Sequence, residues 1–368
     1  MKNYLNFEGD LKNLELEIDK LKDPYEKDGI SKVQTEKIDK LQLEINNKLK
    51  NIYSNLNAWQ TTLVARHEDR PKSKIFIDKI FEDFFPLHGD RLFGDDKSLI
   101  SGLAKIDGRS VLVIGQEKGE DLDTRIERNF GMMKPEGYRK AIRLMRLADK
   151  FNIPVISFID TPGAYPGVGA EERGQAEAIA RSIECSMSIS VPTISIIIGE
   201  GGSGGAIALA SSNRVIMLQN AIYSVISPEG CAAILWRDQK KTLEAATAMK
   251  LTSKDLLDLK IIDEIIPEPI GGAQRDKEVT IENTKKIIIK NLNELSTMSK
   301  DEILNDRKSK FLKIGRDKGL SKSTIIPDGI KIDLNKIVKL KNFLRLYKYP
   351  IGCTFLIFLI LGIILSFN

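Results

Sequence analysis

Residues 193–206 read TISIIIGEGGSGGA, an apolar run that passes into a glycine-rich loop and then into small residues. The β-branched run 193–198 is typical of a buried strand, and residues 206–211 favour a helix. The same order recurs upstream, where run 155–159 is followed by the glycine-rich loop 160–169 and by a helical stretch at 171–189. Alternating strands and helices predict an α/β fold with layered packing.

Further elements extend this pattern on both sides. Short β-branched runs predict strands at 111–114, 215–218 and 223–226, and residues 135–151 predict a helix that has proline at its first position. Ser227-Pro228-Glu229 is a good helix start, with a serine N-cap, a proline and an acid in the first turn. Residues 282–291 and 300–315 predict helices that close the domain.

The glycine loop GEGGSGGA at 199–206 fits three known patterns only in part. Gly199, Gly201 and Gly204 satisfy the dinucleotide fingerprint, but no acid occurs between Glu200 and Glu229 to bind a ribose. Ser203 satisfies a nucleophile elbow, yet no histidine follows it in the chain. A Walker loop also fails, because no Lys-Ser or Lys-Thr follows the glycines.

An oxyanion hole suits the loop better. Glycines let backbone N–H groups point into a cavity, and the following helix adds its positive N-terminal end. Such donors stabilise an enolate or a tetrahedral oxyanion without an acidic or basic side chain. The loop 160–169 could line the same cavity from the other side. A tight strand–helix turn without chemistry remains the alternative for the first loop, and a surface loop for the second.

Composition excludes several other classes of protein. The 368 residues are 42% hydrophobic and 29% charged, which is typical of a globular chain. The three cysteines, Cys185, Cys231 and Cys353, are widely separated, which argues against disulfides and against a cysteine zinc site. Residues 331–350 carry the whole net charge of +5. A neutral body argues against nucleic-acid binding.

Both ends of the chain differ from this α/β part. Apolar residues at helical spacing, interrupted at Asp23-Pro24, predict an N-terminal helical hairpin over residues 1–64. The α/β domain is expected at 65–318, and a basic tail at 319–368. Residues 349–368 have no charged side chain, and their apolar core 351–367 is 17 residues long. One hypothesis is a transmembrane helix at 349–367: its apolar core rises ~25 Å against a hydrocarbon core of ~30 Å, so it would span only with local thinning or with help from its flanks. The alternatives are an amphipathic helix plus a helix buried in an oligomer, or an extension without function.

Four motifs resemble the α subunit of bacterial acetyl-coenzyme A carboxylase carboxyltransferase. They are FIDTPGAYPGVGAEERGQ at 158–175, GEGGSGGA at 199–206, YSVISPEGCAAILW at 223–236 and NFGMMKPEGYRKAIRL at 129–144. FEGDLKNLELEI near the N-terminus and the pattern around Trp59, Arg66, His67 and Pro71 also match. The similarity covers about residues 1–317, so the tail at 319–368 is where the chain departs from the family.

The resemblance implies a crotonase-like fold, a spiral of stacked ββα units, in an α2β2 assembly. It also implies transfer of the carboxyl group of carboxybiotin, borne on a biotin carboxyl carrier protein, to acetyl-CoA. The product is malonyl-CoA, the first committed intermediate of fatty acid biosynthesis. A biotin carboxylase and a β subunit with a four-cysteine zinc ribbon would be partners, and the active site would be shared across the α–β interface. This chain would hold no metal and would be cytoplasmic. The tail is not part of the resemblance, and its basic and apolar residues are what favour attachment to the inner face of the membrane.

Site residues follow by carry-over from the family. Gly204 and Gly205 would stabilise the biotin-side oxyanion, with Gly163 and Ala164 opposite, and the first pair is preferred. Gly201 and Gly202 would contact the cofactor. Arg139 and Arg143, with Arg146 on the same helical face, are either a solvated face or a contact for coenzyme A phosphates or the carrier.

The remaining expectations concern rival functions and residues that are not expected to take part in the site. Another crotonase-like decarboxylase or hydratase, and a membrane-tethered scaffold, remain rival functions. Asp90, Asp95 and Asp96 are expected in surface turns, because their spacing fits no metal-binding loop. His67, His88 and Cys231 are expected to be structural residues.

Overall fold

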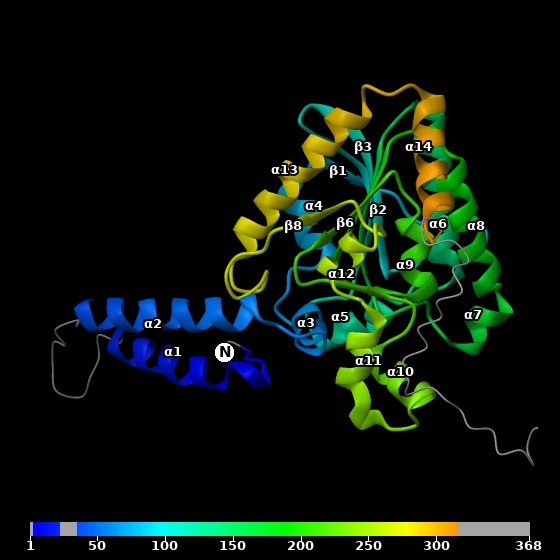
Figure 1. The fold of residues 1–368 in the computed structure, drawn as a ribbon. Coiled ribbons are helices and arrows are strands. Elements are labelled where there is room, and N and C mark those ends of the chain that lie inside the picture. Colours follow the sequence, from blue (N-terminus) through cyan, green and yellow to red (C-terminus); the bar gives the residue numbers. More distant parts are fainter. Residues whose placement is uncertain (1–2, 23–34, 316–368) are drawn as a thin grey trace, which may run out of the picture. The chain divides into compact units, whose positions relative to one another are not determined.

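The structure is a computed structural model, and it describes residues 3–22 and 35–315. Its centre is one mixed sheet with the strand order β1-β2-β3-β4-β5-β6-β8, to which β7 is added beside β5 (Figure 1). Strands β1 to β3 pair antiparallel, and β3 to β6, β7 and β8 pair parallel. The strands are β1 (Glu82–Pro86), β2 (Leu99–Ile106), β3 (Arg109–Gln116), β4 (Val155–Thr161), β5 (Thr193–Gly202), β6 (Arg214–Leu218), β7 (Ile222–Ser224) and β8 (Glu264–Ile266).

Helices connect and cover the strands. Those before the glycine loops are α1 (Gly9–Lys22), α2 (Thr35–Ser54), α3 (Ala58–Ala65), α4 (Ser73–Ile80), α5 (Leu122–Glu127) and α6 (Pro135–Phe151). Those after them are α7 (Val168–Glu172), α8 (Gln175–Ser188), α9 (Ser203–Ala210), α10 (Pro228–Leu235), α11 (Thr242–Met249), α12 (Ser253–Asp258), α13 (Lys277–Leu295) and α14 (Lys300–Lys313). Short 3-10 turns lie at Asn6–Glu8, Asn129–Gly131 and Gln239–Lys241.

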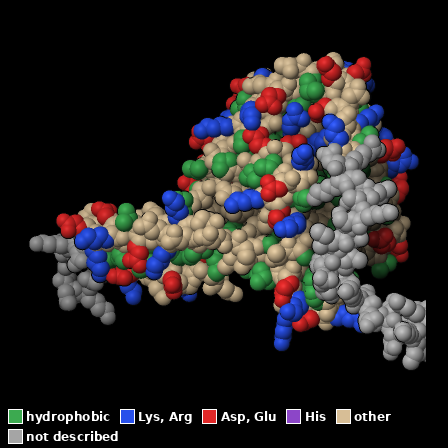
Figure 2. All heavy atoms as spheres, viewed as in Figure 1, with side chains coloured by type: hydrophobic (Ala, Val, Ile, Leu, Met, Phe, Trp, Pro, Cys, Tyr) green, Lys and Arg blue, Asp and Glu red, His purple; other side chains and the backbone are tan. Residues whose placement is uncertain are grey.

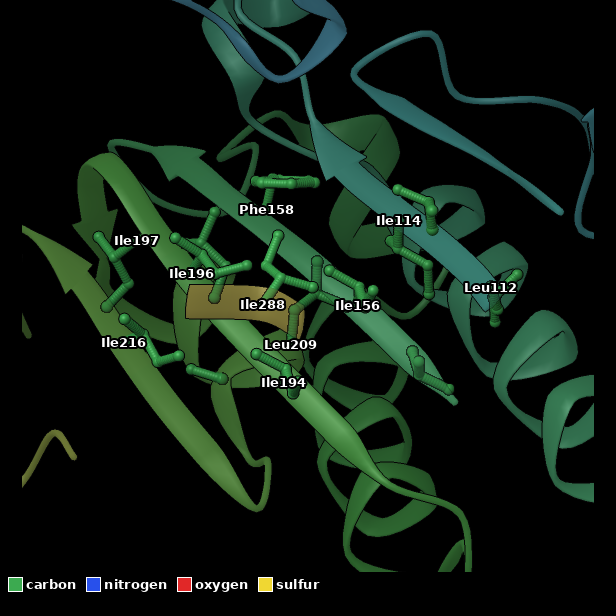
Figure 3. Close-up of a cluster of buried hydrophobic side chains, with 14 of the residues drawn as sticks. Leu112, Ile114, Ile156, Phe158, Ile194, Ile196, Ile197, Leu209, Ile216 and Ile288 are labelled. Carbon is green, nitrogen blue, oxygen red and sulfur yellow. The ribbon is translucent and has the colours of Figure 1, made fainter. Parts of the chain in front are cut away.

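The central parallel strands β4 and β5 are buried on both faces, as their continuous apolar runs predict. Every residue of β4 and β5 is buried. Helices α6 and α9 pack on β3, β4 and β5 together with α8, while α4 and α13 pack against each other and on the sheet. Figure 3 shows Leu209 of α9 and Ile288 of α13 close to Ile156, Ile194 and Ile196 of the strands. The core therefore lies between the sheet and the helices that cover it.

Most predicted elements are confirmed. The runs at 111–114, 155–159, 193–198 and 215–218 lie within β3 to β6, and 135–151 is α6, with Pro135 at its first position. The hydroxyl of Ser227 accepts from the N–H of Gly230 at 3.0 Å, which confirms the predicted N-cap of α10. β7 ends at Ser224, two residues earlier than predicted.

One helix prediction was wrong, and three strands were not predicted. Residues 171–189 form no single helix, because Gly174 adopts a left-handed φ of +80° that separates α7 from α8. β1, β2 and β8 were absent from the sequence prediction. β1 carries two acids and ends in proline, and β8 has only three residues, so neither shows a strand pattern.

The N-terminal helices pair as the sequence predicts. Leu11 and Ile18 of α1 meet Ile45 and Leu49 of α2 in a small apolar cluster of their own. Arg275, which precedes α13, binds Glu15 at 2.5 Å and Glu8 at 3.1 Å and so ties the hairpin to the chain that follows the sheet. The division into residues 1–64, 65–318 and 319–368 stays a prediction.

Charge is mixed on the surface of the described residues. On the face that Figure 2 shows, basic and acidic side chains are interspersed rather than gathered by sign. In the ranges 3–22 and 35–315, no helix combines the length and the apolar character that a bilayer crossing needs. The C-terminal helix predicted at 349–367 lies outside the described residues.

Candidate active site at two glycine loops

The two glycine loops meet at the carboxyl ends of β4 and β5. Thr161 pairs with Gly201 in the parallel ladder, so the loops leave the sheet side by side. A Cβ on Gly202 would lie 2.2 Å from the carbonyl oxygen of Pro162, and one on Gly205 would lie 2.7 Å from the carbonyl carbon of Gly163. The two loops can therefore approach this closely only because both positions are glycine, since real Cβ atoms are essentially never found at such distances.

Helix α9 begins inside this contact and presents its N-terminal N–H groups there. Its N-cap is Gly202, and no side chain in the described part of the chain caps it. The first N–H groups of a helix have no partner within the helix. Ser203 adopts a φ of +51°, which is unusual for a residue with a side chain and often marks a functional turn. The donors of Gly204 and Gly205 are thus available for an anion.

Ion pairs among three charged side chains join the two loops, and we call this group the clamp: Lys118, Asp160 and Glu200. The Nζ of Lys118 lies 2.9 Å from Oδ1 of Asp160 and 2.7 Å from Oε2 of Glu200. The same Oδ1 of Asp160 accepts the backbone N–H of Glu200 at 3.0 Å. All three side chains are at most 14% exposed, so these interactions lie away from the screening of bulk water. The clamp joins the strand ends of β3, β4 and β5.

The electrostatics of the clamp keep the carboxylate of Glu200 ionised. Burial alone would raise the pKa of Glu200, but Lys118 and Arg66 outweigh burial and lower this pKa to about 2. Burial lowers the pKa of nearby Lys72 to about 8 against the opposing charge of Asp160. Glu200 is therefore a poor general base near neutral pH, because a useful base has a pKa near the working pH.

A small cavity opens beside the second loop. Its volume is about 30 Å³, and it is lined by Arg66, Pro162, Glu200, Gly201, Gly202, Ile222, Ser224, Ile226 and Ser227. Arg66, the C-cap residue of α3, donates to Glu200 at 2.6 Å and to Glu229 at 2.5 Å. This volume holds little more than a water molecule and is far below the ~300–1,000 Å³ of pockets that enclose a small-molecule ligand by themselves. A second surface would be needed to close it.

The structure brings the predicted glycines together but not the predicted arginines. Gly204, Gly205, Gly163 and Ala164 adjoin one another, and Gly201 and Gly202 line the cavity. The N–H of Gly163 donates to the hydroxyl of Thr161 at 3.2 Å, so that donor is already engaged. Arg139 and Arg143 on α6 instead hold the turn at residues 88–90. Arg139 donates to Asp90 at 3.0 Å, and Arg143 donates to the carbonyl of Gly89 at 3.1 Å.

Two expectations about acidic residues were wrong. Asp90 and Asp96 are not on the surface: they are 7% and 3% exposed. Asp90 accepts the backbone N–H groups of residues 92 to 94, and Asp96 accepts those of Ser98 and Lys134. Buried carboxylates need such partners, and tertiary packing supplies them here. Asp95 is one-third exposed and binds the buried Lys140.

Neither histidine lies in the lining of this cavity. The Nε2 of His67 lies 3.1 Å from the carbonyl oxygen of Asn3, and the ring is buried. His88 is exposed and lies 3.2 Å from Asp95. Cys231 is 8% exposed in a cluster with Ala232 and Ala245 on α10 and α11, which agrees with a packing role.

Lys118, Asp160 and Glu200 were not predicted as a group. Each lies at or just beyond the end of a buried strand, and the carboxyl ends of parallel strands share one edge of a sheet. Ligand sites of open α/β sheets occur at this edge. That rule, applied to charged residues as well as to glycines, could have found them.

Comparison with known proteins identifies the family. A family model described as acetyl co-enzyme A carboxylase carboxyltransferase-like matches residues 4–315. The chain belongs to this family. A relative from Pelagibacter ubique strain HTCC1062, named acetyl-coenzyme A carboxylase carboxyl transferase subunit alpha, is 68% identical, and the match covers 98% of both chains. A relative of the same name from Agrobacterium fabrum is 54% identical over 86% of this chain and 100% of its own length.

Solved structures agree with the carboxyltransferase family in fold. Transcarboxylase 12S, with methylmalonyl-coenzyme A and methylmalonic acid bound, has a TM-score of 0.52 at 20% identity, covering 63% of this chain and 42% of its own. A Pseudomonas malonate decarboxylase hetero-tetramer in complex with coenzyme A has a TM-score of 0.50 at 17% identity, covering 58% and 86%. The fold is the crotonase-like α/β fold that the resemblance predicted.

Proposed function

We propose that this chain is the α subunit of an acetyl-CoA carboxylase carboxyltransferase, which moves the carboxyl group of carboxybiotin to acetyl-CoA and gives malonyl-CoA. The observation that carries the proposal is the contact of Gly205 with Gly163 and Ala164 at the uncapped start of α9. The N–H groups of Gly204 and Gly205 lie in the first turn of that helix, and neither His67 nor His88 lines the cavity beside it. Membership of the family supplies the substrate class.

The residues of this chain act mainly by stabilising negative charge. Carboxybiotin, carried by another protein, is the substrate that supplies the carboxyl group. As the N–C bond breaks and the new C–C bond forms, charge develops on the ureido oxygen and on the thioester oxygen of acetyl-CoA. The N–H groups of Gly204 and Gly205 stabilise the first charge, and preorganised donors of this kind are worth ~10²–10³ in rate each. The engaged N–H of Gly163 supports the preference for this pair.

The proton of the acetyl methyl group needs an acceptor that is not a histidine of this chain. His67 is bound to Asn3, and the carboxylate of Glu200 has a pKa of about 2. The ureido nitrogen that loses the carboxyl group is the base of suitable strength, so proton and carboxyl group exchange places between the two substrates. The clamp of Lys118, Asp160 and Glu200 then has a positioning role.

Gly201 and Gly202 lie in the lining of the cavity. A side chain at Gly202 would collide with Pro162, and one at Gly201 would lie 2.9 Å from the ring of Tyr223. These glycines let the end of β5 pack closely against Pro162 and Tyr223, so that backbone rather than side chains lines this part of the cavity. We assign them to the biotin side of the site.

The contact for coenzyme A phosphates is assigned to the α6 arginines. Arg139 already forms an ion pair with Asp90, whereas both bonds that Arg143 donates go to neutral carbonyls. Arg143 is therefore the better candidate, because its charge is less compensated.

Partner subunits are expected to close the site. The cavity is small and open, and Val225, Ile234 and Leu235 in and before α10 are 73%, 67% and 56% exposed. An apolar rim beside an incomplete cavity favours a protein partner. We propose a zinc-ribbon β subunit in an α2β2 assembly, served by a biotin carboxyl carrier protein and a biotin carboxylase.

The tail adds a proposal on location. The P. ubique relative matches over nearly the full length of this chain, whereas the whole A. fabrum relative corresponds to 317 of its residues. A tail of this length therefore occurs in one relative and not in the other. We propose that the enzyme is cytoplasmic and that residues 319–368 attach it to the inner face of the membrane.

Co-expression with a β subunit from the same genome tests the function. Malonyl-CoA formation from acetyl-CoA and carboxybiotin is measured for each subunit alone and for both together. We expect product only from the complex. Product from this chain alone would favour a self-sufficient crotonase-like enzyme, and an assembled complex without product would favour a scaffold.

A further inference from the structure

Arg66 forms its ion pairs at the wall of the cavity beside the second glycine loop. It lines the cavity beside Gly201 and Gly202, and its guanidinium binds two carboxylates at once. The Nε donates to Glu200 at 2.6 Å, while Nη1 and Nη2 donate to Glu229 at 2.5 and 3.4 Å. Arg66 thus presents a two-pronged donor edge, occupied by Glu229, at the wall of the proposed active site.

The two carboxylates are held very differently. Glu200 is 10% exposed and is also bound by Lys118 at 2.7 Å, with its backbone N–H fixed by Asp160. Glu229 is 42% exposed and lies in the first turn of α10, and Arg66 is the one cation paired with it in the described ranges. Of the two, Glu229 is the partner that another carboxylate can replace.

The pairing of the guanidinium points the same way. Arg66 shares Glu200 with Lys118, so its Nη1 and Nη2 lose their carboxylate partner when Glu229 is displaced. A partly buried cation without a partner is costly, so the guanidinium then needs another anion.

We propose that Arg66 is the receptor for the carboxylate in transfer, and that this carboxylate takes the place of Glu229 on the guanidinium. The ligand class is a substrate carboxylate, that of carboxybiotin in the forward direction and of malonyl-CoA in the reverse. A guanidinium matches a carboxylate in shape as well as charge, because both are planar and can bind through two parallel hydrogen bonds. The inference rests on the proposed function.

The test uses the α–β complex and two variants whose effects should have opposite signs. Dissociation constants are measured for malonyl-CoA and acetyl-CoA, which differ by one carboxylate, together with the KM for malonyl-CoA in the presence of free biotin. Arg66→Gln should weaken malonyl-CoA binding by ~10-fold or more, the usual size for a lost hydrogen bond to a charged group, and leave acetyl-CoA within twofold. Glu229→Gln should strengthen malonyl-CoA binding, since it removes the competing carboxylate.

Two controls separate this role from a structural one. Arg181→Gln removes an arginine that also binds two glutamates, Glu177 and Glu184, but on the exposed face of α8, and it should change nothing. Arg66→Lys keeps the charge without the fork and should recover part of the lost affinity.

The outcomes are distinct. If Arg66 and Glu229 only hold α10 in place, both variants will weaken both ligands in the same direction, and the inference is overturned. Should Arg66→Gln fail to assemble, Glu229→Gln alone decides, because an unchanged or weaker affinity for malonyl-CoA contradicts the exchange. A wild-type complex that makes no malonyl-CoA would instead reject the proposed function.

Discussion

Alanine at Gly205 and alanine at Gly204 should behave very differently, although the two residues are neighbours in one loop. A Cβ at Gly205 would lie 2.7 Å from the carbonyl carbon of Gly163, 2.8 Å from its oxygen and 3.0 Å from the nitrogen of Ala164. All three atoms are backbone. A Cβ at Gly204 would lie 3.5 Å from the side chain of Ile179, which is an ordinary contact.

The size of the effect follows from the displacement. To reach 3.4 Å, where contacts become ordinary, the two loops must separate by about 0.7 Å. Overpacking of this kind costs ~1–3 kcal/mol, and a shift near 1 Å in a catalytic group can cost ~10²-fold in rate. We therefore expect Gly205→Ala to lower kcat by ~10²-fold, and Gly204→Ala to stay within a few-fold because its N–H is retained.

The assay is malonyl-CoA formation by purified complexes, each checked for assembly by size-exclusion chromatography. Gly204→Ala is the matched control, since it adds the same methyl group one residue away. Larger side chains extend the series, and Gly204→Val and Gly205→Val should both lower turnover. Wild-type kcat in an assembled Gly205→Ala complex would refute the argument that this contact sets the position of the donors.

Three further predictions concern the loop serine, the clamp and the tail. Ser203→Ala should keep most of the activity, and fluorophosphonates should not label the chain, because no histidine follows Ser203 in the sequence; stoichiometric labelling at Ser203 would contradict this. Since the pKa of Glu200 falls from 4.5 to about 2 on folding, its ion pairs contribute fully above about pH 4.5, and this stability, on the order of 3 kcal/mol, is lost as the pH falls toward 2. Glu200→Gln should therefore flatten the free energy of unfolding between pH 2 and 5, and a slope equal to that of the wild type would count against the clamp. Removal of residues 321–368 should leave an active complex and abolish sedimentation with membranes, and full-length protein found wholly in the high-speed supernatant would exclude attachment.

The sequence predicted the buried centre of this fold and missed its edges. Strands β3 to β6 contain continuous runs of β-branched residues, and such runs predict buried strands from the local sequence alone. β2 was missed because Gly102 interrupts its pattern; a Cβ there would lie 2.3 Å from the carbonyl oxygen of Phe85 on β1. That constraint comes from a neighbouring strand, which single-sequence patterns do not contain.

The difference between local and long-range constraints also explains which parts of the site were predicted. The glycines stand in two short motifs and could be read locally. The partners of Arg66 lie 134 and 163 residues away along the chain, so their ion pairs exist only after folding. Likewise, Asp90 and Asp96 look like turn residues in sequence, and their burial follows from the packing of α6 over them.

The clamp of Lys118, Asp160 and Glu200 has a consequence for how substrates enter. Because one ammonium group bridges acids from two successive strand ends, neither loop can swing outward without separating buried opposite charges. A hinged lid is thus a poor description of either loop. Under the proposed function, access would be docking, in which biotin on its carrier reaches the site while the loops stay still. Selectivity among acyl groups would then depend on the rigid fit between two subunits, and exchanging β subunits between species should alter substrate preference more than changes within these loops.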